Sequence, residues 1–187
     1  GTGTTYDDTG VVAGTHYYYK VTTMDGSSES CMSSSEGDAI ATGGSGTYWS
    51  GATGNWSSPS VWATVSAGTP TGYGPPVTGE IVNIRPNTVT VNANAVCASL
   101  LVGYGSANNQ ILTFSGSVTL TIAGALNVGT SGSSTRPGNL AFTIGATVVA
   151  GSVQLNHNLK GTEKSVITMA AGGKLITGSL AVAGKLS

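Results

Sequence analysis

Charged side chains are scarce in this chain. Asp, Glu, Lys and Arg make up 8% of its 187 residues, about a third of the usual share in soluble domains. The formal net charge is −1, and the sequence has neither a basic stripe nor a polybasic run. It therefore predicts no attraction to nucleic acid or to an anionic membrane surface. Solubility has to come from hydroxyl groups, amides and exposed backbone.

Long apolar runs are also missing. No stretch reaches the roughly 18 apolar residues that a helix needs to cross a bilayer, so no membrane-spanning segment is predicted. The first residues do not show the charged and then apolar pattern of a signal peptide. We expect any export signal to lie upstream, in a longer precursor.

Cysteine is nearly absent, which excludes a disulfide framework. We expect the two cysteines, Cys31 and Cys97, to behave as small buried hydrophobic residues. A bridge between them is the less favoured alternative.

The groups that carry most enzyme chemistry are few and far apart. Glycoside hydrolysis needs two carboxyl groups about 5 to 9.5 Å apart, but residues 81–187 contain only Glu163. The two histidines, His16 and His157, lie far from each other and show no zinc-ligand spacing with the cysteines. No calcium loop or phosphate-binding motif occurs. The sequence predicts no enzymatic activity, no cofactor and no metal.

The sequence is rich instead in short strands separated by turn formers. From Glu80 onward, runs of Val, Ile, Leu and Thr alternate with Gly, Asn and Ser, as expected for a stacked or sandwiched all-β protein. The predicted strands are 81–84, 88–91, 99–102, 111–114, 118–122, 125–128, 140–144, 153–155, 165–168 and 174–177.

Charge divides the chain near Gly43. Residues 1–43 hold six acids and one base, whereas residues 44–187 hold two acids and six bases. This change of sign suggests two modules. Within the first, a predicted strand places Tyr17, Tyr19 and Val21 on one face, toward a core, and Tyr18 on the other.

The first module resembles the C-terminal half of a fibronectin type III domain. The resemblance rests on residues 5–21, where Val11 and Ala13 replace the Leu and Pro of the family's Leu-x-Pro-Gly-Thr-x-Tyr corner and Tyr17 stands at the corner tyrosine. It implies a partial β-sandwich over residues 1–42. Half a sandwich cannot close its core alone, so either the chain is a fragment or strands from elsewhere complete the sheet.

The second module is similar to repeats of large bacterial adhesin-like and autotransporter-like surface proteins. The opening Trp-x-Gly-x-x-Gly-x-Trp-Ser-x-x-x-x-Trp spans residues 49–62, and Ser99-Leu100-Leu101-Val102 matches a Ser-Leu-x-Val element. The resemblance implies a right-handed β-helix, also called a β-solenoid. The expected layout is a fibronectin-like part at 1–42, a Gly/Ser linker at 43–47, a Trp/Pro-rich cap at 48–80 and a β-solenoid at 81–187.

An internal echo supports stacking. Residues 116–129 recur in pattern at 173–184, as expected when each coil of a repeat protein buries its apolar edge against its neighbours. An uncovered last coil would present unpaired backbone, and we expect it either to continue into residues beyond this sequence or to recruit another chain, giving a homo-oligomer or filament through open β edges.

The favoured function is an extracellular or cell-surface structural or adhesive segment that assembles into a filament or surface layer. The alternative is a carbohydrate-binding module of a secreted polysaccharide-active protein, with a surface glycan as its partner. Five aromatic residues are the candidates for stacking on sugar rings, although a hydrophobic cap is the favoured role for them: Tyr48, Trp49, Trp56, Trp62 and Tyr73.

Overall fold

The computed structural model of the chain describes residues 16–32, 37–40, 46–66, 68–70, 72, 74–104, 110–130, 137–156 and 164–183. The described part is built from strands, together with one short 3-10 helix, η1 (Pro59–Val61). The all-β class predicted from the sequence is confirmed. No helix among these residues is long and apolar enough to cross a membrane.

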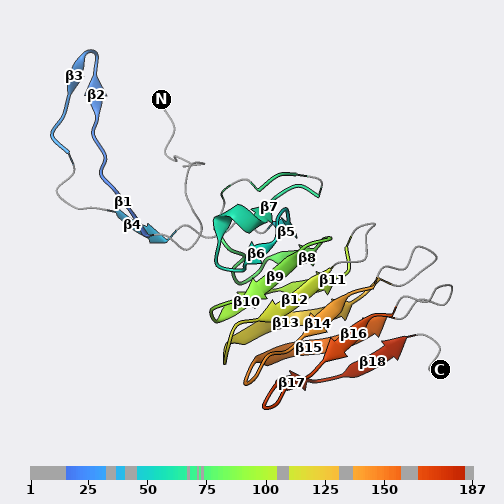
Figure 1. The fold of residues 1–187 in the computed structure, drawn as a ribbon. Helices are drawn as coiled ribbons and strands as arrows, with labels where there is room; N and C mark the ends of the chain where they lie inside the picture. Colours follow the sequence, from blue (N-terminus) through green and yellow to red (C-terminus); the bar gives the residue numbers. More distant parts are fainter. Residues whose placement is uncertain are drawn as a thin grey trace.

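Two small antiparallel pairs form the N-terminal part (Figure 1). β1 (His16–Tyr19) pairs with β4 (Gly37–Ile40), and β2 (Met24–Asp25) pairs with β3 (Ser28–Glu29). Tyr17 and Tyr19 are half-buried and stack with ring centroids 6.4 Å apart, whereas Tyr18 is exposed, which confirms the predicted alternation. The prediction is wrong for Val21, which is exposed because β1 ends at Tyr19.

The rest of the described chain forms two sheets whose strands are almost all parallel. The strands of the larger sheet are β5 (Thr47–Ser50), β7 (Trp62–Ala63), β8 (Ile81–Ile84), β10 (Ala95–Cys97), β11 (Ser99–Val102), β13 (Thr119–Val128), β15 (Thr147–Asn156), β17 (Lys174–Thr177) and β18 (Leu180–Ala183). The second sheet holds β6 (Gly54–Asn55), β9 (Thr88–Val91), β12 (Ile111–Phe114), β14 (Asn139–Ala141) and β16 (Val166–Thr168).

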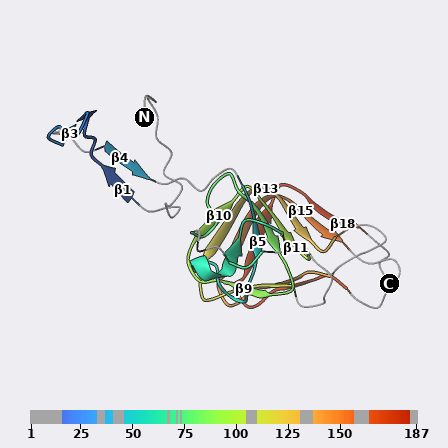
Figure 2. The same cartoon turned by 90° about the horizontal axis from the view of Figure 1, so that it is seen from above.

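The chain passes from one sheet to the other and back, and each such pass lies on the previous one (Figures 1 and 2). We call each pass a tier. The last tiers have a regular length: Leu126 pairs with Val153, and Val153 pairs with Leu180, so register partners stand 27 positions apart. The first tiers are less regular, as the uneven spacing of their strands indicates.

A bend divides β13 and β15 into two segments each. The pairing register of β13 with β15 shifts between Ile122 and Ala125. A small residue stands at the bend in each successive tier, namely Ala98, Gly124, Gly151 and Gly178. The N–H of Gly124 donates to the Ala98 carbonyl oxygen at 2.8 Å, and a Cβ on Gly151 would lie 2.9 Å from the Ala123 oxygen. Close approach of the tiers at this bend therefore requires glycine at position 151, whereas the first tier has alanine, Ala98, at the equivalent place.

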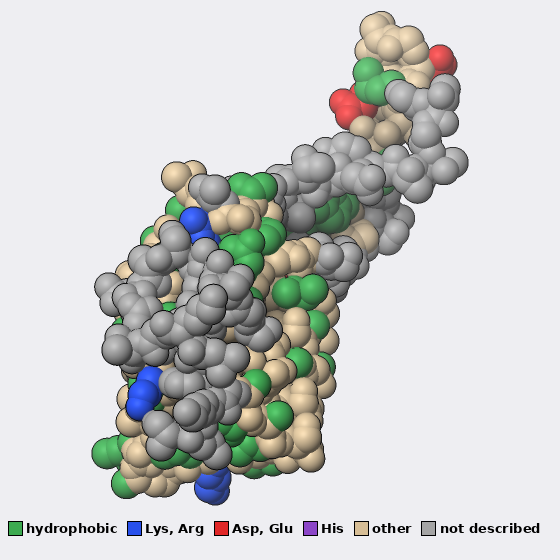
Figure 3. Space-filling model, turned by 90° about the vertical axis from the view of Figure 1, so that its right-hand side faces the viewer, with side chains coloured by type: hydrophobic (Ala, Val, Ile, Leu, Met, Phe, Trp, Pro, Cys, Tyr) green, Lys and Arg blue, Asp and Glu red, His purple; other side chains and the backbone are tan. Residues whose placement is uncertain are grey.

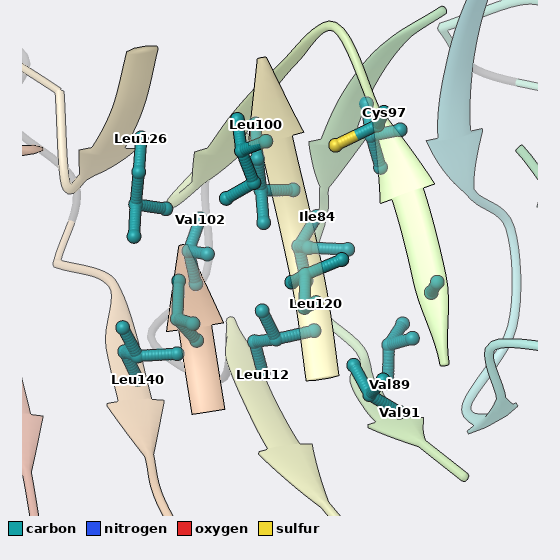
Figure 4. Packing of buried hydrophobic residues seen from close by; sticks show 14 of the residues in the cluster. Ile84, Val89, Val91, Cys97, Leu100, Val102, Leu112, Leu120, Leu126 and Leu140 are labelled. Carbon is teal, nitrogen blue, oxygen red and sulfur yellow. The ribbon is translucent and has the colours of Figure 1, made fainter. Parts of the chain in front are cut away.

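The core consists of aliphatic side chains that repeat in register from tier to tier (Figure 4). Leu100, Leu126 and Val153 share one column and are each at most 1% exposed. Leu112 and Leu140 share another column in the second sheet and are fully buried. Full burial of each such side chain contributes roughly 1.5 to 3 kcal/mol, so this column packing is the main source of cohesion.

Buried polar side chains follow the same tier spacing. The Asn156 amide Nδ2 donates to the Gly129 carbonyl oxygen at 2.9 Å, and Ser165 Oγ accepts from the Gly138 N–H at 3.2 Å, both across 27 positions. These contacts satisfy backbone groups where the chain leaves one sheet for the other.

The structure explains the internal echo of the sequence. Residues 119–128 form β13, and the equivalent residues of the later segment form β17 and β18, with β15 between them. The two echoing segments therefore occupy the same place two tiers apart.

The two cysteines differ in their surroundings. Neither forms a disulfide, Cys97 is buried as expected, and Cys31 is exposed. The expectation of a buried residue was wrong for Cys31, because it follows the small β2–β3 hairpin and no second layer of described residues covers that position.

Charge is segregated as the sequence indicates. Two acidic side chains, Asp25 and Glu29, lie on the β2–β3 hairpin, while the described part of the stack shows few charged side chains on the face in Figure 3.

Candidate functional site

Aromatic side chains gather at the start of the stack, where the sequence predicts a Trp-rich cap. We call this group the aromatic end, and it consists of Tyr48, Trp49, Trp56, Trp62 and Tyr104. Tyr48 and Trp49 lie on β5, Trp56 follows β6, Trp62 begins β7, and Tyr104 follows β11.

Three of these rings form the interior of the aromatic end. Tyr48, Trp56 and Trp62 are 4%, 3% and 0% exposed. The ring of Trp62 meets Trp56 edge-on at 4.9 Å between centroids and meets Tyr48 edge-on at 6.4 Å. Edge-to-face contacts at these distances are favourable, and the Trp62 Nε1 donates to the Trp56 carbonyl oxygen at 2.7 Å.

Glycine and proline fold this segment back onto the first tier. Pro59 begins η1, where its missing N–H costs nothing. The Gly51 N–H donates to the Val61 carbonyl oxygen at 2.7 Å, and a Cβ on Gly54 would lie 2.8 Å from a Val61 methyl carbon. The Trp56 N–H donates to the Thr90 carbonyl oxygen at 2.7 Å, which anchors the segment to β9.

The other two rings lie at the surface of the larger sheet. Neighbouring strand residues alternate, so Tyr48 points inward with its partner Val82, while Trp49 lies on the outer face with its partner Asn83. Trp49 and Tyr104 are half-buried and meet edge-on with centroids 6.5 Å apart. The Trp49 Nε1 is buried and has no hydrogen-bond partner among the described residues.

Glu80 is a fully buried carboxyl group beside the aromatic end. Its Oε2 accepts a hydrogen bond from the Val77 N–H at 2.7 Å, and the Tyr48 hydroxyl donates to the same carboxyl group. Burial raises the pKa of Glu80 above its ordinary value, and the two hydrogen bonds offset part of this effect. Its Oε1 is buried without a hydrogen-bond partner in the described part of the chain.

Cys97 belongs to the same surroundings. Burial and, as the smaller cause, the charge of Glu80 together raise the pKa of the Cys97 thiol to about 12. A thiol with such a pKa stays protonated at neutral pH, so Cys97 is not a nucleophile here.

The five predicted ligand-binding residues thus fall into three groups. Tyr48, Trp56 and Trp62 are core residues, and their rings have no free face for a sugar. Trp49 is half-buried, and Tyr73 lies outside the described residues. A ligand role stays a prediction, and the geometry favours it only at Trp49.

Sequence reasoning missed Tyr104 and the buried position of Glu80. Tyr104 follows the Ser-Leu-x-Val strand and lies far along the chain from Trp49, so only the tier register brings the two rings together. The sequence gives only a weak indication of the position of Glu80, which directly precedes an aliphatic strand and is thereby placed at a strand end. Its burial depends on Tyr48 from another tier.

The described residues contain no group of side chains suited to a metal ion. No three His, Cys, Asp or Glu side chains among them come together in an arrangement that could hold a metal ion. Glu163 and His157 lie outside the described residues.

Comparison with known proteins gave no relative. No protein-family model, curated protein or solved structure matches this chain. Function has to be inferred from the geometry above.

Proposed function

We propose that this chain is a segment of an extracellular structural or adhesive protein. In this proposal residues 81–187 form a right-handed β-solenoid, residues 48–80 cap it, and residues 1–42 are half of a fibronectin type III-like sandwich joined by the linker at 43–47. The stack acts as a stiff rod that holds or presents neighbouring parts of a cell-surface assembly.

The observation that carries the proposal is the register of apolar columns across tiers. Leu100, Leu126 and Val153 lie one above another at no more than 1% exposure, and parallel backbone hydrogen bonds join the same tiers. A parallel stack of this kind transmits force along a ladder of backbone hydrogen bonds and resists proteases, because its backbone groups are paired. The right-handed turn is the one that parallel crossover connections adopt in nearly all known cases.

The surface supports an extracellular setting. It is rich in Ser, Thr, Asn and Gly and poor in charge, and the chain has no cytosol-like mixture of Lys and Glu. Glu80 is the one carboxyl side chain among the described residues from 46 to 183, and the proposal assigns no reaction to the stack.

Labelling of intact source cells tests the location. Antibodies raised against the chain should bind cells that have not been permeabilised, and brief protease treatment of those cells should remove the signal. Binding that appears only after permeabilisation would contradict an extracellular role.

Limited proteolysis of the purified chain tests the rod. The segment from residue 46 to 183 should survive protease concentrations that cut the linker at residues 43–47, and mass spectrometry should identify the surviving fragment. Rapid cleavage within β13 or β15 would contradict a stacked rod.

Carbohydrate binding is the second candidate, and the half-buried Trp49–Tyr104 pair at the surface of the larger sheet favours it. Trp49→Ala should abolish binding to a neutral polysaccharide on a glycan array, while Trp49→Phe should retain part of it by preserving the contact with Tyr104. Tyr18→Ala is a matched control, because it removes an aromatic ring that is 64% exposed on the N-terminal part. Absence of binding by the unmodified chain to any polysaccharide would eliminate this candidate.

A further inference from the structure

One outward-facing column of the larger sheet combines an aromatic ring with amide side chains. Register places in it one residue from each of β5, β8, β11, β13, β15 and β18, which follow one another in Figure 1. We call it the amide column, and it consists of Trp49, Asn83, Leu101, Asn127, Gln154 and Ala181. On the first five of these strands the preceding residue is buried in the core, so the column lies on the outer face. None of its side chains is charged.

The amides of this column have no hydrogen-bond partner within the described part of the chain. Stacked Asn and Gln side chains can bond to one another from strand to strand, but the register partners Asn127 and Gln154 make no such bond. Asn83 is 7% exposed, and its amide is likewise unpaired among the described residues. Removing an amide from water without a hydrogen bond costs free energy, which a ligand with its own donors and acceptors would recover.

The ring pair of the aromatic end stands at the head of the column. β8 lies between β5 and β11, so the contact between Trp49 and Tyr104 spans the strand that carries Asn83. The Tyr104 N–H donates to the Ile84 carbonyl oxygen at 2.9 Å, which holds this residue beside β8. An indole N–H and an amide, both unpaired among the described residues, therefore lie on neighbouring strands about 5 Å apart. An aromatic face beside polar groups of this kind suits a sugar ring, which has both C–H faces and hydroxyl groups.

The neighbouring outer column is built from small side chains. Two positions before the column residues of β11, β13 and β15 stand Ser99, Ala125 and Ser152, on the same face of the sheet. Such short side chains do not wall in the longer amides beside them. A ligand lying over the small residues can therefore reach the amides from the side and contact Leu101 between them.

We propose that the amide column binds a neutral polysaccharide chain lying across the strands, with one sugar ring at Trp49 and later rings at Asn127 and Gln154. Four strand-to-strand steps of about 4.8 Å separate Trp49 from Gln154, so the column takes roughly 19 Å of chain, or about four rings. Its lack of charge favours a neutral chain, because an anionic one calls for Lys or Arg partners. This proposal rests on the carbohydrate-binding candidate above and extends it from one ring pair to a site that crosses several tiers.

Titration calorimetry with neutral glucan, mannan, xylan and galactan oligomers of one to six rings tests the proposal. Affinity should rise with chain length up to about four rings and then level off. Asn127→Leu combined with Gln154→Leu removes both amides at similar size, so it should weaken binding of four-ring oligomers about tenfold and leave single sugars unaffected. Asn139→Leu is the matched control, because it replaces a half-buried amide on the outer face of the second sheet, and it should bind normally.

The outcomes separate this proposal from those on which it rests. Binding that requires Trp49 but depends neither on chain length nor on the two amides would overturn the amide column and leave the ring pair as the whole site. Binding to none of the oligomers would overturn both the column and the carbohydrate-binding candidate. Cell-surface labelling tests the structural role independently of either result.

Side-chain amide resonances keep the test decisive if the double variant does not fold. When the unmodified chain is titrated with the four-ring oligomers, the NH₂ signals of Asn83, Asn127 and Gln154 should shift, while those of Asn139 should not. Shifts confined to the Trp49 indole would contradict the column. Tighter binding of anionic polygalacturonate than of every neutral oligomer would also contradict it, because the column offers no cation.

Discussion

The indole nitrogen of Trp62 donates a 2.7 Å hydrogen bond to the backbone carbonyl oxygen of Trp56, and both side chains are buried. This bond closes the segment between β6 and β7, because it joins the two ends of the turn that holds η1. The aromatic end is therefore a small folded unit placed on the first tier, and contacts local in sequence hold the rings of Trp56 and Trp62 together.

Removing the Trp62 ring should destabilise the stack strongly. Trp62→Ala loses a fully buried side chain and leaves the Trp56 carbonyl without its donor, so the free energy of unfolding should fall by about 3 to 5 kcal/mol. Trp62→Phe keeps most of the packing and should cost about 1 to 3 kcal/mol for the unpaired carbonyl. Urea unfolding followed by far-ultraviolet circular dichroism measures both, and a change below about 1 kcal/mol for Trp62→Ala would show that the aromatic end does not support the tiers.

Leu126 and Leu180 occupy the same column, but Leu126 is buried between two tiers and Leu180 is exposed on the last one. Leu126→Ala removes a fully buried side chain between two tiers and should lower the free energy of unfolding by about 2 to 5 kcal/mol. Leu180→Ala is the matched control in the same column, and it should cost well under half as much, since Leu180 is 59% exposed. Equal losses at both positions would contradict the column packing.

The two thiols should differ in reactivity. Cys31 is exposed, whereas burial and the charge of Glu80 raise the pKa of Cys97 to about 12. Iodoacetamide at pH 8 should therefore modify one thiol per folded chain and two in denaturant, as counted by mass spectrometry. Cys31→Ser should show no modification in the folded state. Fast labelling of that variant would mean that the first tiers open readily.

The strands from Ile81 onward could be predicted because each aliphatic run ends in a turn former. Ile81–Ile84, Thr88–Val91, Ser99–Val102 and Lys174–Thr177 have the predicted bounds. Ala95–Cys97 was missed, since three residues followed by Ala98 carry little pattern. The first half of β15 was also missed, because Gly151 indicates a strand end but stands at a bend inside one continuous strand.

The candidate site was less predictable than the strands. Sequence proximity groups Tyr48, Trp49, Trp56 and Trp62, and the structure does bring them together. Whether a ring lies in the core or at the surface depends on which face of its strand it occupies. Tyr48 and Trp49 are neighbours on β5, so one points inward and the other outward. The contact between Trp49 and Tyr104 depends on tier register, which the irregular spacing of the first tiers conceals.

The buried carboxyl group of Glu80 predicts an unusual dependence of stability on pH. Burial raises the folded-state pKa of Glu80 above its value in the unfolded chain, so the folded state holds the proton more tightly. The stabilisation from this group is complete below the unfolded pKa and is lost as pH rises through the folded pKa. The free energy of unfolding should therefore decrease with rising pH over that interval, by about 1.4 kcal/mol for each unit between the two pKa values.

Glu80→Gln isolates this effect. The amide oxygen of Gln can still accept hydrogen bonds from the Val77 N–H and the Tyr48 hydroxyl, but it carries no charge to bury. The variant should be more stable than the unmodified chain at pH 7 and should lose the negative slope with pH, as measured by urea unfolding between pH 4 and 8. Glu29→Gln, at an exposed position on β3, is the control and should leave the slope unchanged. A Glu80→Gln variant that is less stable at pH 7 would mean that the charged carboxylate, held by its two donors, is the form that the folded chain prefers.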